Sequence, residues 1–186
     1  MSKHDRFRVS INLFIFHSSL FLFGVILASV FLRLSSNDLR SLFFQKFDEY
    51  YDFSGITSCA VLILQECFWI LLIALLSQFR YGRPFNFLIL IYKGFGAGII
   101  SSIACAQLGI SGIKYIFFLV LPPNLFYISS LCIASQASFE HAAFASGVHN
   151  RLISIDRKVY LICFLLSILG GIVESYYVPW IYNILF

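Results

Sequence analysis

The stretch Lys93-Gly94-Phe95-Gly96-Ala97-Gly98 decides the fold. It lies inside a chain of 186 residues that is 60% hydrophobic and only 12% charged, whereas soluble domains carry about 25% charged residues. A lysine and three glycines within an apolar segment of membrane length are costly unless they face protein rather than lipid. We therefore expect this segment to be a transmembrane helix that makes specific contacts along its small residues.

Five apolar segments are each long enough to cross a hydrocarbon core, which needs roughly 20 residues of helix. They lie near residues 11–32, 58–79, 85–108, 113–137 and 159–182. The alternating segments of about ten residues that characterise membrane β-barrels do not occur. The first segment has a basic start like a signal peptide, but its apolar core is about twice the usual 7–15 residues, so we expect a retained anchor. The sequence predicts an all-α, polytopic membrane protein that forms a single domain over residues 1–186.

The net charge of +4 is explained by topology rather than by a nucleic-acid-binding patch. Basic residues gather before the first span, after the second and before the fifth: Lys3, Arg6, Arg8, Arg80, Arg83, Arg151, Arg157 and Lys158. Cytoplasmic loops of membrane proteins carry an excess of Lys and Arg. We therefore predict that the N-terminus is cytoplasmic and, with five spans, that the C-terminus is outside.

The longest external loop is expected to contain an amphipathic helix near residues 37–53. Asn37 can cap this helix. Its apolar residues recur at helical spacing, at Leu39, Leu42, Phe43, Phe47 and Tyr50. Such a helix either lies on the outer membrane surface or docks an extracytoplasmic partner, and the two roles are compatible.

Two ionisable residues are predicted at membrane depth. Glu66 lies inside the second span, where a carboxylate normally faces the helix bundle or a polar cavity. Glu66 has either a functional role or a structural role as a protonated, hydrogen-bonded carboxyl group. Lys93 lies about two turns into the third span, and its stem is long enough to reach back to the cytoplasmic interface.

The glycines of the third span form a helix-packing motif. Gly94 and Gly98 make a GxxxG pair, with more small surface at Gly96, and such a pair lets the backbones of two membrane helices approach closely. The glycines lack the preceding strand and the GK[ST] of a phosphate-binding loop. The packing partner is either another helix of this chain or another subunit, which leaves a homo-oligomer open.

The fourth span is interrupted at Pro122-Pro123. These residues remove two backbone donors and predict a kink near mid-membrane. Asn124 can satisfy a freed carbonyl or bond a neighbouring helix. A substrate-binding break is the alternative, although no second broken helix marks an inverted repeat. The short turn at residues 108–112 predicts an antiparallel hairpin of the third and fourth spans, or else a partly re-entrant third span.

The sequence offers no constellation for catalysis or metal binding. Its cysteines are scattered, without a CxxC or Cys/His ligand spacing: Cys59, Cys67, Cys105, Cys132 and Cys163. No Ser/His/Asp set and no paired external carboxylates at catalytic spacing occur. We expect no enzymatic activity, no metal and no cofactor.

The order of these features resembles the stage II sporulation protein M family. The resemblance rests on Lys93-Gly94, on Gly98, on the Leu108-Gly109…Gly112 turn and on Pro122-Pro123-Asn124-Leu125. It extends over nearly the whole chain and its five spans. Some members of the wider family carry P-H-G-x-x-E at the proline position. The histidine and the glutamate are missing here, which favours the sporulation-type branch.

This resemblance implies a membrane scaffold for endospore formation. It would recruit and position peptidoglycan hydrolases, the stage II sporulation proteins D and P, in the bacterial mother-cell or septal membrane during engulfment. Their membrane anchors would pack on Gly94 and Gly98, and the external loop would add contacts. The alternative is a permease-like subunit of an ABC-type transporter with a separate ATPase, in which Glu66, Lys93 and Asn124 line a pathway.

Overall fold

The computed structural model describes residues 3–35, 41, 56–77, 82–145 and 157–185, and all regular elements among them are helical. The all-α prediction is confirmed. The predicted amphipathic helix near residues 37–53 lies outside the described residues, apart from Ser41.

In chain order the elements are α1 (Lys3–Leu34), α3 (Ile56–Leu76), α4 (Gly82–Leu108), α5 (Ile110–Tyr115), the π-helical turn η2 (Ile116–Val120), α6 (Leu121–Ala145), α7 (Arg157–Ile172), the π-helical turn η3 (Val173–Tyr177) and α8 (Val178–Leu185).

Within the described residues, five helical stretches are long and apolar enough to cross a membrane. They are Phe14–Leu34, Ser58–Leu76, Pro84–Leu108, Ile110–Ser138 and Lys158–Ile184. They match the five predicted spans to within a few residues. The fourth and fifth spans each join α-helix through one π-helical turn to α-helix.

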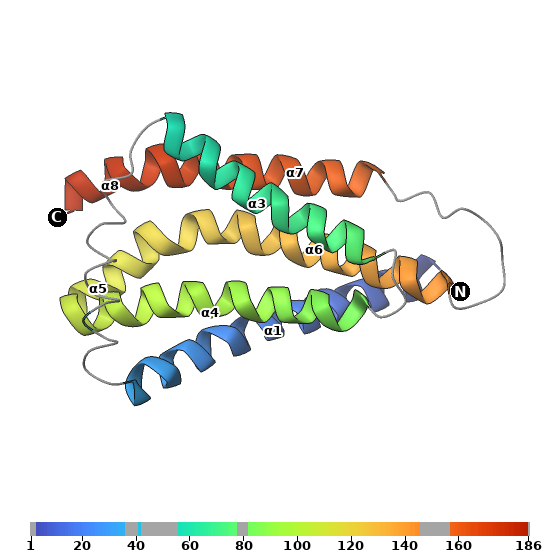
Figure 1. The fold of residues 1–186 in the computed structure, drawn as a ribbon, viewed down its shortest axis with the longest axis horizontal. Helices are drawn as coiled ribbons and strands as arrows, with labels where there is room; N and C mark the ends of the chain where they lie inside the picture. The colour runs from blue at the N-terminus through green and yellow to red at the C-terminus, as the bar shows by residue number, and fades with distance from the viewer. Residues whose placement is uncertain (1–2, 36–40, 42–55, 78–81, 146–156, 186) are drawn as a thin grey trace.

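The helices form one bundle around α6 (Figure 1). α1 and α4 lie side by side along one edge, and α7 continues through η3 into α8 along the opposite edge. α6 lies between these edges and packs against α1, α3, α4 and α7. The start of α1 and the end of α8 lie at opposite ends of the bundle, as an odd number of spans requires. Which end faces the cytoplasm stays a prediction.

Two clusters of buried side chains hold the bundle together. The larger one joins α3, α4, α6 and α7 through residues such as Ile70, Leu90, Leu131 and Cys163. The smaller one lies at the C-terminal end of the bundle and centres on Tyr115, which is almost fully buried. The outer surface of the spans is covered by exposed Leu, Ile, Val and Phe side chains, as a lipid environment favours.

A single residue, Gly109, connects the third and fourth spans. Its φ of 56° is left-handed, a conformation that glycine adopts without steric cost. The chain then turns back, and Gly112 packs so closely on α4 that an added Cβ would overlap the Ala104 carbonyl oxygen. The predicted hairpin is confirmed. The alternative of a re-entrant third span was wrong, because α4 is continuous from Gly82 to Leu108.

The start of α4 corrects one further expectation. The third predicted span begins near residue 85. The helix instead begins at Gly82 and includes Pro84 in its first turn. Proline is tolerated there because the first backbone N–H groups of a helix have no intrahelical acceptor.

Candidate functional site

The glycine motif of α4 packs against α1 of the same chain. A Cβ at Gly94 would overlap the carbonyl oxygen of Phe21, and a Cβ at Gly98 would lie 2.7 Å from the carbonyl oxygen of Val25. Both pairs are offset by 73 residues, so α1 and α4 run parallel in constant register. Helix α1 occupies the face of α4 on which the anchors of partner proteins were expected to pack.

Helix α1 contributes a matching pair of small residues that sequence reasoning missed. Gly24 lies so close to Ile91 that an added Cβ would overlap its carbonyl oxygen, and Ala28 is fully buried beside Gly98. Gly24 and Ala28 are four residues apart, the spacing of a small-xxx-small motif. This spacing was visible in the sequence among the phenylalanines of the first span. Ser29 and Ser102 extend the contact with a hydroxyl–hydroxyl hydrogen bond of 3.0 Å.

Gly96 lies on a different face of α4 and is not part of this contact. It is exposed, and no atom lies within 4 Å of where its Cβ would be. The three glycines therefore divide into two that meet α1 and one that faces outward.

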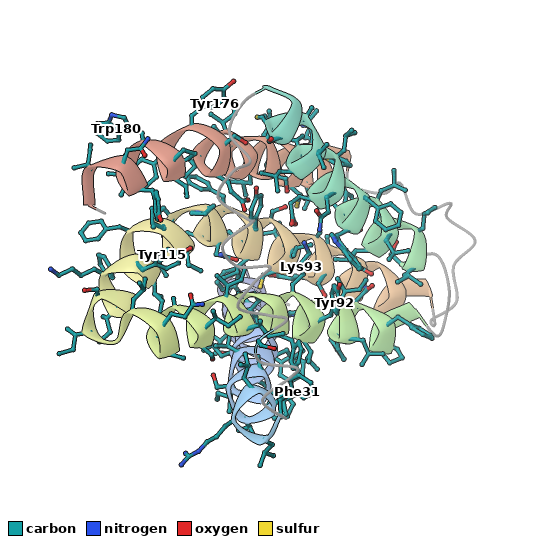
Figure 2. All side chains as sticks on the ribbon, turned by 60° about the vertical axis from the view of Figure 1, so that its left-hand side comes forward. Phe31, Tyr92, Lys93, Tyr115, Tyr176 and Trp180 are labelled. Atoms are coloured by element: carbon teal, nitrogen blue, oxygen red, sulfur yellow. The ribbon has the colours of Figure 1, made fainter. Side chains whose placement is uncertain are left out.

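The two ionisable residues predicted at membrane depth, Glu66 of α3 and Lys93 of α4, form an ion pair. The Lys93 ammonium donates to Oε1 of Glu66, and only 8% of the Glu66 surface is exposed. Lys93 also lies 5.4 Å from the ring centroid of Trp69, a distance at which a cation is attracted to the aromatic face. Figure 2 shows Lys93 inside the bundle, whereas Tyr176 and Trp180 project away from it. Lys93 is therefore held inside the bundle rather than extended to the cytoplasmic interface.

A second polar pair links α6 to η3. The Tyr127 hydroxyl donates to Oε2 of Glu174 over 2.8 Å. The Tyr127 ring lies against Gly170, where an added Cβ would be 2.5 Å from Cε1. The partners of Glu66, and the roles of Tyr127 and Trp69, were not predicted.

The proline pair of the fourth span lies just after the π-helical turn. The turn widens the helix so that the N–H of Leu121 bonds the Ile116 carbonyl, one residue beyond the α-helical partner. The Asn124 amide donates to the Val120 carbonyl over 2.7 Å. The acceptor lies in the same span but is not one of the carbonyls that the prolines free, which in an α-helix are those of Phe118 and Leu119. Pro122 and Pro123 lie within the first turn of α6, and the helix continues through them.

The described residues contain no group of three or more His, Cys, Asp or Glu side chains that could hold a metal ion. The five cysteines are free thiols, and Cys132 and Cys163 are buried.

These features define a helical multi-pass membrane protein whose spans are joined by glycine packing and intramembrane polar pairs. The family model of Stage II sporulation protein M matches residues 17–179, well over half of the chain. The chain belongs to this family. No curated protein and no solved structure matches it.

Proposed function

We propose that the protein is a membrane scaffold of endospore formation, which recruits and positions peptidoglycan hydrolases during engulfment. The family match over residues 17–179 carries this proposal. The hydrolases would be the stage II sporulation proteins D and P, and the chain itself would have no hydrolytic activity. Its place would be the mother-cell or septal membrane.

The geometry of the bundle supports a scaffold in one respect. Its conspicuous motifs serve internal contacts: Gly94 and Gly98 pack on α1, and Glu66 pairs with Lys93. These contacts fix the spans relative to one another, as a platform for other proteins requires. Partner anchors would then bind elsewhere than on Gly94 and Gly98, and the external loop of residues 33–57 remains the proposed contact on the outer side.

A permease-like subunit is the second candidate, and the intramembrane ion pair of Glu66 and Lys93 is the observation that favours it. Ionisable groups at membrane depth commonly mark ion or substrate pathways. In this structure, however, Glu66 and Lys93 neutralise each other and the Asn124 amide donates to its own helix. These contacts favour a structural role for the three residues over a pathway.

The proposal is tested by purifying the tagged protein from mild-detergent membranes through nutrient starvation and identifying the proteins that come with it. We expect wall hydrolases, and only in cells that have begun to sporulate. Recovery of an ATPase without hydrolases would contradict the scaffold and assign the chain to the permease class.

A matched pair of glycine variants sharpens this test. Gly98→Ile forces α1 away from α4, so it should reduce hydrolase recovery, whereas Gly96→Ala meets open space and should not. Membrane levels of both variants are measured in parallel. Normal recovery with Gly98→Ile at normal level would show that partner binding does not depend on the α1–α4 contact.

A further inference from the structure

Gln65 is a polar side chain on the lipid-facing surface of α3. It is exposed, and among the described residues it has no hydrogen-bond partner. It lies seven residues from Ser58 and eleven from Leu76, the ends of the candidate span. At 1.5 Å per residue these separations are about 10 and 16 Å, too far for a glutamine to reach either interface.

An amide in that position is costly in lipid. Moving an amide without a partner into a hydrocarbon environment costs about 4–8 kcal/mol, and acyl chains offer neither donor nor acceptor. Glutamines in membrane helices instead hydrogen-bond across helix–helix interfaces. Gln65 therefore calls for a further helix that brings a donor and an acceptor to the same depth.

A groove beside Gln65 can receive such a helix. It lies between α3 and α4, has a volume of about 320 Å³, and is lined by Trp69, Leu72, Leu76, Phe85, Leu88, Ile89 and Tyr92. Gln65 precedes Trp69 by four residues, and Gly96 follows Tyr92 by four. Each therefore continues its wall of the groove by one turn.

One further observation distinguishes this groove from an ordinary lipid-filled furrow. Gly96 leaves open space on the opposite wall, where the backbone of a further helix can approach closely.

We propose that the occupant is α3 of a second copy of this chain, and that the groove is a homodimer interface centred on Gln65. An amide is both donor and acceptor, so two Gln65 side chains can form two reciprocal hydrogen bonds. A two-fold axis along the membrane normal brings any residue opposite its own copy at the same depth. The exposed ridge of Leu64, Phe68 and Leu71 lies next to the groove on α3, so each copy offers both a ridge and a groove.

The test is self-association of the full-length protein, purified alone and reconstituted in lipid vesicles at a series of protein-to-lipid ratios. Energy transfer between labelled copies measures the dimer fraction. We expect Gln65→Leu to weaken association about tenfold, on the scale of two interhelical hydrogen bonds, and Gln65→Asn to retain most of it. Gly96→Leu, which fills the groove, should weaken association as well. A monomeric wild type, or equal association of wild type and Gln65→Leu, would overturn the proposal.

A photo-crosslinking amino acid identifies the occupant directly. Placed at position 65, it should capture a second copy. At Ile162, an exposed residue of the α7 span, it should capture none. Equal capture at both positions would mean random collision and overturn the interface. Capture in cells of a different membrane protein from position 65, with none of a second copy, would overturn the homodimer and assign the groove to a foreign helix. At a protein-to-lipid ratio low enough for both proteins to be monomeric, Gln65→Leu should leave thermal unfolding unchanged, which separates loss of association from loss of fold.

Discussion

The two neighbours of α4 are held by different physical means, and the change occurs between adjacent residues. Gly94 meets the backbone of α1, and Lys93, one position earlier, reaches Glu66 on α3. The α1 contact is largely apolar and depends on small residues that let two backbones touch. The α3 contact depends on opposite charges shielded from lipid.

This comparison explains why the two contacts tolerate change differently. In a bilayer, helix association draws little from the hydrophobic effect and depends on close packing and on hydrogen bonds. A glycine contact fails when atoms are added, because the opposing backbone cannot move aside alone. An ion pair fails when one partner is removed, because the remaining charge is left buried.

The largest effect is expected where atoms are added to the α1 contact. Gly94→Leu places a side chain where the Phe21 carbonyl lies, so α1 must move as a whole. We expect a loss of about 4 kcal/mol or more in the free energy of unfolding, at the upper end of single substitutions. Denaturation of the purified protein by SDS in mixed micelles measures it.

Gly96→Leu is the matched control for this variant. It adds the same atoms two residues away, where no atom lies within 4 Å. Its free energy of unfolding as a monomer should stay within about 0.5 kcal/mol of the wild type. Equal losses for both variants would mean that helix propensity, rather than contact with α1, sets the cost.

The next effect concerns the ion pair. Lys93→Met leaves Glu66 without a counter-charge and should cost about 3 kcal/mol in unfolding free energy. The double variant Lys93→Met/Glu66→Met removes both charges and should recover most of the loss. A double-mutant cycle on SDS unfolding measures the coupling. Additive losses would show that the two residues act independently.

A smaller effect is expected at the second polar pair. Tyr127→Phe removes the hydroxyl that donates to Glu174 and keeps the ring that lies on Gly170. We expect a loss of about 1.5 kcal/mol, the scale of a hydrogen bond to a charged group. Tyr176 is an exposed tyrosine of η3, the π-helical turn that also carries Glu174, and Tyr176→Phe should leave the free energy of unfolding unchanged. A loss of the same size at Tyr176 would contradict this assignment.

The sequence was sufficient for the spans and for the existence of a close contact along the third span. Apolar runs of membrane length admit few alternatives to helices. The partner of the contact was not predictable, because any span with a small-xxx-small pair fits Gly94 and Gly98. Gly24 and Ala28 make the first span a candidate partner for Gly94 and Gly98. The partner is decided, however, by the register and rotation of the helices relative to one another.

The polar pairs show the same limit. Glu66 and Lys93 were each predicted at membrane depth, yet their pairing depends on how α3 and α4 rotate about their axes. The hydrogen bond from Tyr127 to Glu174 joins two different spans, and the two residues are 47 positions apart in the sequence. It also depends on η3, whose π-helical turn changes the direction of Glu174. Local patterns carry no information on such a turn.

The smallest effect separates packing from hydrogen bonding within the α1 contact itself. Ser29 and Ser102 share a hydrogen bond across α1 and α4, and the Ser29 hydroxyl is also within 3.1 Å of the Val25 carbonyl. Because Ser102→Ala leaves Ser29 with that backbone acceptor, we expect a loss of only about 0.6 kcal/mol in unfolding free energy, the average for such bonds in membranes. A loss above about 2 kcal/mol would show that the contact is held by its hydroxyls, and Gly94→Leu would then owe part of its cost to displacing them.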